Sequence, residues 1–176
     1  MSVPVGIDAK IVLLDEAMMR RQDARDAGLC VVLTNGVFDL LHAGHVRYLE
    51  EARREGDILI VALNDDACVR RLKGHPRPLV TLADRAVVVA ALASVDLVLS
   101  FGQSTAEEVV ATLQPDVYVK GGDYDPAASR GQKGYLPEAA VVVAYGGRVA
   151  VLSFVDGRST TNLVHHIVRV HHPTSS

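Results

Sequence analysis

The apolar residues of this chain fall into short runs that alternate with longer segments in which polar and apolar residues mix. Five runs have the length of a strand and are rich in Val, Leu and Ile; they lie at 30–33, 58–63, 95–99, 117–119 and 149–152. Segments of helical length separate and follow them, at 44–55, 65–72, 82–92, 105–113, 135–145 and 160–170. Strands that alternate with helices predict a parallel sheet covered on both faces, because right-handed crossovers carry helices to each side. We therefore expect an α/β protein with a Rossmann-like, doubly wound sheet of five parallel strands.

Particular residues indicate where helices begin and end. A further helix-like segment, 14–27, precedes the first strand and is followed by Gly28 in a C-cap position. Side-chain oxygens just before three other predicted helices can accept hydrogen bonds from the free N–H groups of the first turn. These residues are Asn64, Thr81 with Asp84 three positions later, and Ser104 with Glu107 three positions later.

Length and composition favour one domain. The 176 residues fit a single domain, since domains usually span about 100–200 residues. Nearly half of the residues are hydrophobic, yet the chain has no Trp and only three Phe, which predicts an aliphatic core. We expect a leading segment and helix at 1–28 packed on the domain, the main α/β domain at 29–170 and a flexible tail at 171–176.

The charge balance excludes several kinds of partner. Eighteen Lys and Arg against 21 Asp and Glu give a net charge of −3, so we expect no nucleic-acid partner. No apolar stretch approaches the roughly 18 residues that cross a bilayer, and no basic leader starts the chain, so we expect no membrane partner and a cytoplasmic location. Cys30 and Cys68 lack metal or disulfide spacing and are interpreted as plain thiols.

The clearest candidate chemistry directly follows the first predicted strand, where residues 34–45 read TNGVFDLLHAGH. Asn35 and Gly36 predict a turn with little bulk, which lets backbone N–H groups approach a phosphate. His42 and His45, three apart around Gly44, would point the same way at the positive start of a helix and form a cradle for a polyphosphate. Each residue alone is ordinary; the combination of strand, turn, histidine pair and helix start favours function.

This stretch resembles the nucleotidyltransferase superfamily marked by HxGH, which includes cytidylyltransferases, pantetheine-phosphate adenylyltransferase and class I aminoacyl-tRNA synthetases. Further segments appear in order: RLKGHPRP at 71–78, Arg85, VKGGDY at 119–124 and DGRSTTN at 156–162. The series is similar to the adenylyltransferase domain of the bacterial heptose pathway, which makes ADP-D-glycero-β-D-manno-heptose from ATP and the heptose 1-phosphate. The resemblance covers about residues 8–170. In many relatives this domain is fused to a sugar kinase, and 176 residues leave no room for one. The resemblance therefore implies a stand-alone enzyme, with a separate sugar kinase acting upstream.

The resemblance implies roles for residues at the matching positions. The catalytic group would be His42, His45 and Lys73. The nucleotide would be bound by Thr34, Asn35, Gly36, Phe38, Gly44, Lys120, Gly121, Asp123, Ser159, Thr160 and Thr161. The sugar phosphate would be bound by Asp39, Arg77 and Arg85.

Several of these residues also have plainer interpretations. Arg85 fits an exposed helix position as well as a phosphate ligand, and Asp39 fits a loop-holding role as well as a contact to a substrate hydroxyl. Lys120 and Asp123 fit a capped turn as well as a nucleotide or sugar contact. Ser159 alone fits an ordinary N-cap, whereas three consecutive hydroxyls after a glycine favour contact with the phosphates of a nucleotide.

The implied reaction is attack of a sugar phosphate oxygen on the α-phosphorus of ATP, with pyrophosphate as leaving group. Alignment and electrostatic stabilisation supply most of such catalysis. Mg²⁺ would arrive with the nucleotide, and no side chain is assigned as a metal ligand. The resemblance also implies a homodimer. Three alternatives stay open. The first is a glycerol-3-phosphate-type cytidylyltransferase, which shares HxGH and the STT element. The others are another sugar-phosphate nucleotidyltransferase and a non-catalytic nucleotide-binding module.

Overall fold

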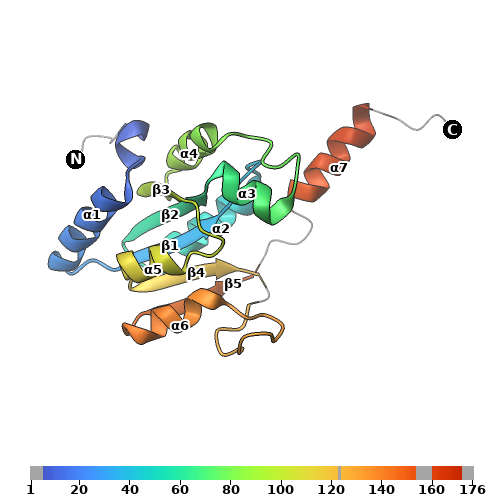
Figure 1. Ribbon diagram of the computed structural model, residues 1–176. Coiled ribbons are helices and arrows are strands. Elements are labelled where there is room, and N and C mark those ends of the chain that lie inside the picture. Colours follow the sequence, from blue (N-terminus) through green and yellow to red (C-terminus); the bar gives the residue numbers. More distant parts are fainter. Residues whose placement is uncertain (1–5, 123, 154–159, 172–176) are drawn as a thin grey trace.

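A five-stranded sheet in the order β3-β2-β1-β4-β5 forms the centre of the computed structural model, which describes residues 6–122, 124–153 and 160–171 (Figure 1). Every neighbouring pair of strands is parallel. The strands are β1 (Val31–Gly36), β2 (Ile58–Asn64), β3 (Leu97–Phe101), β4 (Val117–Gly121) and β5 (Arg148–Leu152). All five predicted strands are present, and the predicted doubly wound α/β fold is confirmed.

Helices cover both faces of the sheet. They are the short 3-10 helix η1 (Ile7–Lys10) and the α-helices α1 (Leu14–Asp26), α2 (Ala43–Arg53), α3 (Asp66–Lys73), α4 (Leu82–Ala90), α5 (Glu107–Leu113), α6 (Pro137–Ala144) and α7 (Thr160–His171). Helices α1, α5 and α6 pack on one face, and α2 and α4 pack on the other. None of the helices in the described part of the chain has the length and apolar character to cross a bilayer.

Alternation along the strands divides the core into two layers. In β1, Leu33 contributes to the layer under α1, α5 and α6, whereas its neighbour Val32 contributes to the layer under α2 and α4. Tyr118 and Val119 divide in the same way in β4. Because successive side chains of a strand point to opposite faces, the face of a polar residue near a strand end follows from its position.

The helix ends test the capping predictions. Gly28 has φ +71°, and Gly28 N and Leu29 N donate to the carbonyls of Arg25 and Ala24, which closes α1 in a Schellman motif. Thr81 caps α4 as predicted, since its hydroxyl accepts a hydrogen bond from Asp84 N.

Two capping predictions are wrong. Asp65, not Asn64, caps α3 by accepting from Cys68 N at 2.6 Å. Ser104 does not cap α5: Ala106 stands at the N-cap, and its N–H donates to the Glu138 carboxylate at 2.8 Å. A carboxylate 32 residues away along the chain therefore replaces the local cap.

The strand order has its switch point at β1, where the chain stops adding strands on one side of the sheet and begins to add them on the other. The chain builds β1, β2 and β3 outward on one side of β1 and then adds β4 and β5 on the other side. The carboxyl ends of the strands next to such a switch point form the usual ligand crevice of an open α/β sheet. The predicted HxGH segment leaves β1 at this edge.

Candidate active site

Two histidines meet at the start of α2. His42 is the N-cap of this helix, and its Nδ1 accepts a hydrogen bond from Gly44 N at 3.1 Å. His45 lies in the first turn, and its ring stacks on that of His42 with centroids 3.9 Å apart and planes 22° apart. Because Nδ1 of His42 is an acceptor, a neutral His42 carries its proton on Nε2. The pair thus places two imidazole groups at the positive end of the α2 dipole.

His45 is neutral at physiological pH. Burial lowers the pKa of His45 to about 4, and the neighbouring His42 and Lys73 act in the same direction, against the opposing Leu40 carbonyl. Nδ1 of His45 is buried without a hydrogen bond of ordinary geometry. Both His42 and Lys73 act on the pKa of the His45 ring, which indicates that these three predicted catalytic residues lie close to one another. Lys73 is the last residue of α3, just before Gly74 at φ +75°, and lies one residue beyond the predicted end of that helix.

Phe38 packs against the His45 ring, and Gly36 packs against Phe38. The expected Asn35-Gly36 turn is absent, since both residues belong to β1. Phe38 adopts φ +48° and lies 5.2 Å from the His45 ring, centroid to centroid. A Cβ on Gly36 would come 2.9 Å from the Phe38 ring, so this glycine makes room for the aromatic side chain. Phe38 is buried in the core, where it forms a wall for His45.

Asp39 holds the loop that follows α3. Its carboxylate accepts hydrogen bonds from Arg77 Nη1 at 2.7 Å and from the backbone N–H groups of Leu79 and Val80 at 2.7 and 3.0 Å. Burial alone would raise the pKa of Asp39, but the Arg77 hydrogen bond and the two backbone donors outweigh it and hold the pKa below its ordinary value. The structure therefore pairs the two residues expected to bind substrate, Asp39 and Arg77, with each other.

Arg85 is a buried connector, not an exposed helix residue. Its side chain has 0% exposure and pairs with the Asp66 carboxylate at 2.7 Å. The same guanidinium donates to the carbonyls of Val37, Asn64 and Val80. These contacts join the loop after β1, the start of α3 and the loop before α4. The guanidinium is therefore occupied within the protein, and its expected role as a substrate-phosphate ligand stays a prediction.

Thr34 also pairs within the protein. Its side chain is fully buried, and its hydroxyl shares a 2.7 Å hydrogen bond with the Tyr48 hydroxyl of α2. This contact lies in the packed layer between β1 and α2, away from the cavity lining, and the expected contact of Thr34 with the nucleotide stays a prediction. The next residue, Asn35, points to the other face and reaches a cavity.

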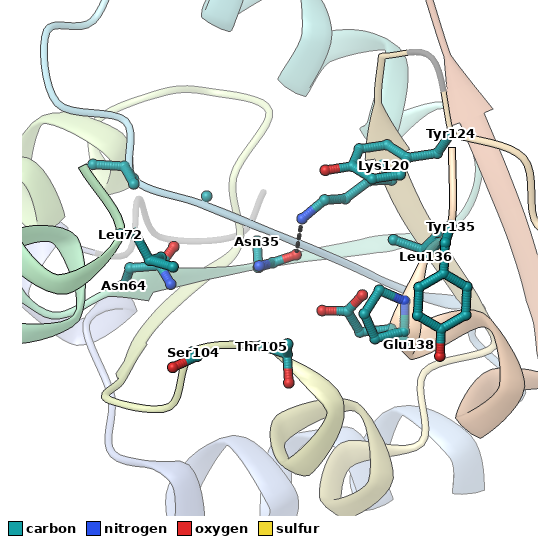
Figure 2. Close-up of a pocket in the computed structure, with 13 residues that line it drawn as sticks. Asn35, Asn64, Leu72, Ser104, Thr105, Lys120, Tyr124, Tyr135, Leu136 and Glu138 are labelled. Carbon is teal, nitrogen blue, oxygen red and sulfur yellow. Dashed lines mark hydrogen bonds between the residues drawn. The ribbon is translucent and has the colours of Figure 1, made fainter. Parts of the chain in front are cut away.

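This cavity, of about 350 Å³, opens at the carboxyl ends of the central strands (Figure 2). Asn35, Asn64 and Lys120 come from the ends of β1, β2 and β4, and the loop before α5 and the start of α6 supply the remaining polar groups. The lining residues are Asn35, Gly36, Val37, Asn64, Leu72, Ser104, Thr105, Lys120, Tyr124, Tyr135, Leu136, Pro137 and Glu138. Its size falls within the range of small-molecule pockets, about 300–1,000 Å³.

Lys120 and Glu138 bring opposite charges into this cavity. Lys120 Nζ donates to Asn35 Oδ1 at 2.8 Å, and the Tyr118 hydroxyl donates to the same oxygen at 2.6 Å. Burial lowers the pKa of Lys120, and the Glu138 carboxylate opposes that shift. Sequence reasoning missed Glu138 and the cavity role of Asn64. Asn64 could have been found from the sequence, because three neighbouring apolar strands each have a polar residue at or near their end.

Four of the remaining expected nucleotide contacts, Gly44, Gly121, Thr160 and Thr161, belong to the described residues. Gly44 N donates to His42, as described, and Gly121 ends β4 opposite Leu152 of β5. Thr160 and Thr161 are the first residues of α7, and α7 has no buried residue. Asp123, Ser159 and the expected tail after His171 lie outside the described residues.

The described residues offer no protein cage for a metal ion. No group of three or more His, Cys, Asp or Glu within 6–122, 124–153 and 160–171 is arranged to hold one. The paired imidazoles are poor partners for Mg²⁺, which prefers oxygen ligands. A magnesium ion carried by triphosphate oxygens would not need such a cage.

Known proteins are similar to this chain in sequence and in fold. The "Bifunctional protein HldE" of Geotalea uraniireducens is 50% identical over 160 residues, which cover 91% of this chain and 31% of that protein. This chain thus spans about a third of the length of that relative. A lipopolysaccharide core biosynthesis protein from Thermoplasma volcanium has a similar structure, with TM-score 0.56 and 27% identity over 73% of this chain and 98% of its own. Pantothenate synthetase from Thermus thermophilus, 20% identical with TM-score 0.50 over 83% and 62% of the two chains, shares the fold.

The family comparison covers most of the chain, including the HxGH segment. A family described as "Cytidylyltransferase-like" matches residues 33–165. That match begins within β1 and ends within α7, so it contains both the histidine pair and the cavity. The resemblance read from the motifs is confirmed, and the chain belongs to the cytidylyltransferase-like family of nucleotidyltransferases.

Proposed function

We propose that this protein transfers AMP from ATP to D-glycero-β-D-manno-heptose 1-phosphate and releases pyrophosphate. The observation that carries the proposal is the stacked pair of His42 and His45 at the start of α2, with Lys73 close enough to affect the pKa of His45. The 50% identity to a protein named HldE supports the same group of nucleotidyltransferases. ADP-heptose would be the product, and a sugar kinase would supply the phosphorylated acceptor.

The reaction needs no covalent intermediate with the enzyme. A phosphate oxygen of the acceptor forms a bond to the α-phosphorus while the bond from that phosphorus to the bridging oxygen of pyrophosphate breaks. Negative charge grows on the leaving group and on the transferring phosphoryl oxygens. Fixed donors placed where charge develops stabilise such a transition state, because they need no reorganisation at the moment of reaction.

The residues at the start of α2 supply these donors. Nε2–H of His42 can donate to phosphate oxygens, His45 can do so when its ring is protonated, and Lys73 adds a positive charge. A bound triphosphate would raise the pKa of His45, since nearby negative charge favours the protonated ring. His45 can therefore strengthen its interaction as charge builds up.

Other residues would position the two substrates. We assign the nucleotide to Gly44, Gly121, Thr160 and Thr161, and we keep Asp123 and Ser159 as expected contacts. Arg77 is 20% exposed while it is paired with Asp39, so it can present its remaining donors to a substrate phosphate. Mg²⁺, bound by the oxygens of ATP, would neutralise part of the charge of the leaving group.

A cytidylyltransferase acting on glycerol 3-phosphate is the second candidate. The family match described as cytidylyltransferase-like favours it, because HxGH chemistry serves either base. Base choice depends on pocket shape and backbone hydrogen bonds rather than on the motif.

A panel of ATP, CTP, GTP and UTP against heptose 1-phosphate and glycerol 3-phosphate tests the proposal, with pyrophosphate release and product mass as readouts. We expect turnover with ATP and heptose 1-phosphate. Product from CTP and glycerol 3-phosphate alone would replace the first candidate by the second. Tight ATP binding with no product from any pair would indicate a non-catalytic nucleotide-binding module.

A further inference from the structure

Three neighbouring strands end in polar residues that point to the same face. Asn64 of β2, Asn35 of β1 and Lys120 of β4 occupy the positions where the apolar pattern of each strand would place another core residue. All three line the cavity under α5 and α6. Buried polar groups reduce stability unless they find partners, so a set of three at one strand edge indicates a binding function.

The charges in the cavity balance, unlike those beside the histidine pair. Lys120 is its cation, held by Asn35, and Glu138 is its anion, with only 3% of the residue exposed. Glu138 Oε1 accepts from Ala106 N, and Figure 2 shows the carboxylate facing the same space as Lys120 and Asn35. A phosphate or other anion would meet an unfavourable carboxylate here, whereas beside Lys73 it meets a positive charge.

The polar groups suit hydroxyls. A sugar hydroxyl donates one hydrogen bond and accepts up to two, so it can use a carboxylate, a carboxamide and an ammonium group together. The cavity lining includes a carboxylate in Glu138, an ammonium group in Lys120 and two carboxamides in Asn35 and Asn64, and the hydroxyl-bearing residues Ser104, Thr105 and Tyr135 also line it. Gly36 and Val37 form part of its lining and lead directly to the HxGH segment.

We infer that this cavity holds the neutral, hydroxyl-bearing body of the acceptor and that Glu138 selects it by accepting hydrogen bonds from its hydroxyls. This inference rests on the proposed function, since the phosphate of the same molecule would lie at His42, His45 and Lys73. Glu138 is a specificity-determining residue in this arrangement. It takes no part in the bond-making step.

The variant Glu138→Gln tests this role with little disturbance of the fold, because the amide oxygen can still accept from Ala106 N. We expect the KM for heptose 1-phosphate to rise about tenfold, as a hydrogen bond to a charged acceptor is replaced by a weaker one. The KM for ATP is expected to stay unchanged. Glu108→Gln is the matched control, since it removes a nearby carboxylate that is exposed and bonded to Gln103 instead.

A structural role for Glu138 predicts a different pattern. If the carboxylate only holds the start of α5, Glu138→Gln lowers the melting temperature and leaves the KM of the acceptor unchanged, which would overturn the inference. A rise in the KM for ATP alone would place the nucleotide in the cavity and would also overturn it, while the proposed reaction would stand.

Tyr135→Phe provides a second variant if Glu138→Gln does not fold. It removes one hydroxyl from the cavity wall and keeps the ring, and the expected rise in acceptor KM is about threefold. If glycerol 3-phosphate is the true acceptor, the heptose assignment fails and the same variants are scored on the KM for glycerol 3-phosphate. If neither acceptor reacts, calorimetric titration of heptose 1-phosphate into wild type and Glu138→Gln decides: weaker binding by the variant supports the inference, and equal affinity or no binding overturns it.

Discussion

The two sides of β1 end in different chemistry. On the α2 side, a stacked histidine pair lies at a helix start, where backbone N–H groups and Lys73 make the surroundings positive. On the α5 and α6 side, Lys120 and Glu138 balance each other within a cavity. In the proposed reaction, the first arrangement would stabilise growing negative charge, and the second would suit a neutral, hydroxylated group. Alternation of side chains at one strand end would then separate the catalytic groups from the groups that recognise the acceptor.

Removing His45 is expected to have the largest effect. In His45→Ala the kcat should fall about a hundred- to thousandfold, equivalent to about 3–4 kcal/mol of lost transition-state stabilisation. The KM for the acceptor should change little, because His45 lies on the α2 side rather than in the cavity. Steady-state kinetics of the folded variant measure both quantities.

His171→Ala provides the matched control for His45→Ala. His171 ends α7 and is exposed, so its loss should leave kcat and the melting temperature unchanged. An unaltered kcat in folded His45→Ala would remove the basis for assigning catalysis to the α2 side.

Asp39→Asn should weaken the loop that borders the α2 side. The change removes the charge that pairs with Arg77 and replaces an acceptor of two backbone N–H groups. We expect a loss of about 2–3 kcal/mol in the free energy of unfolding, measured by urea denaturation. Asp84→Asn is the control, because Asp84 is an exposed carboxylate at the start of α4. We expect it to lower the free energy of unfolding by a smaller amount.

The same interaction predicts a pH dependence of stability. The folded pKa of Asp39 lies below its ordinary value, so its contribution is present above the unfolded pKa and is lost as the pH falls through the folded pKa. Wild type and Asp39→Asn should therefore converge in stability under acidic conditions. A constant difference down to low pH would contradict the ion pair as the source of the effect.

The layers of this fold could be predicted from the sequence because periodicity is local. The five strand runs and their helices appear in the order of the apolar pattern, and the HxGH residues are adjacent in the chain. Thr34 and Asn35 show how far such reasoning can go: alternation alone assigns them to opposite faces. Once one face is known to carry a cavity, only Asn35 can line it.

Contacts between distant segments could not be predicted in this way. Arg85 fits an exposed helix position by sequence, yet it is buried because carbonyls from three separate segments meet around it. Glu138 gave no signal in the pattern of α6, since the Ala106 N–H from which it accepts a hydrogen bond belongs to another element. The start of α5 was misplaced for the same reason.

The titration of His45 sharpens the assignment of Lys73 to the α2 side. The His45 ring should stay neutral from neutral pH through mildly acidic pH in the free protein and protonate near its pKa of about 4, observed as the shift of its Cε1 proton by NMR. Lys73→Met should raise that midpoint, because a positive neighbour that opposes protonation is removed. An unchanged midpoint would place Lys73 too far from the ring to share its phosphate.

The folded pKa of His45 also sets a stability trend. The unfolded ring binds a proton near the ordinary histidine pKa of 6.5, and the folded ring does so only at a pKa of about 4. Between these values the unfolded state holds more protons, so stability falls as the pH decreases through that window. In His45→Ala this part of the pH dependence should be absent.

Thr34→Val should have the smallest effect and tests the comparison most directly. Thr34 precedes the cavity residue Asn35 by one position but bonds Tyr48 within the α2 layer. Valine fills the same volume without the hydroxyl, so we expect a loss of about 1 kcal/mol in stability, measured by urea denaturation. The Tyr48 hydroxyl retains a contact with the Val119 carbonyl at 3.3 Å, which limits the cost. Both KM values should stay at the wild-type level, because the substituted side chain reaches neither the histidine pair nor the cavity; a rise in the KM for ATP would place Thr34 at the nucleotide site.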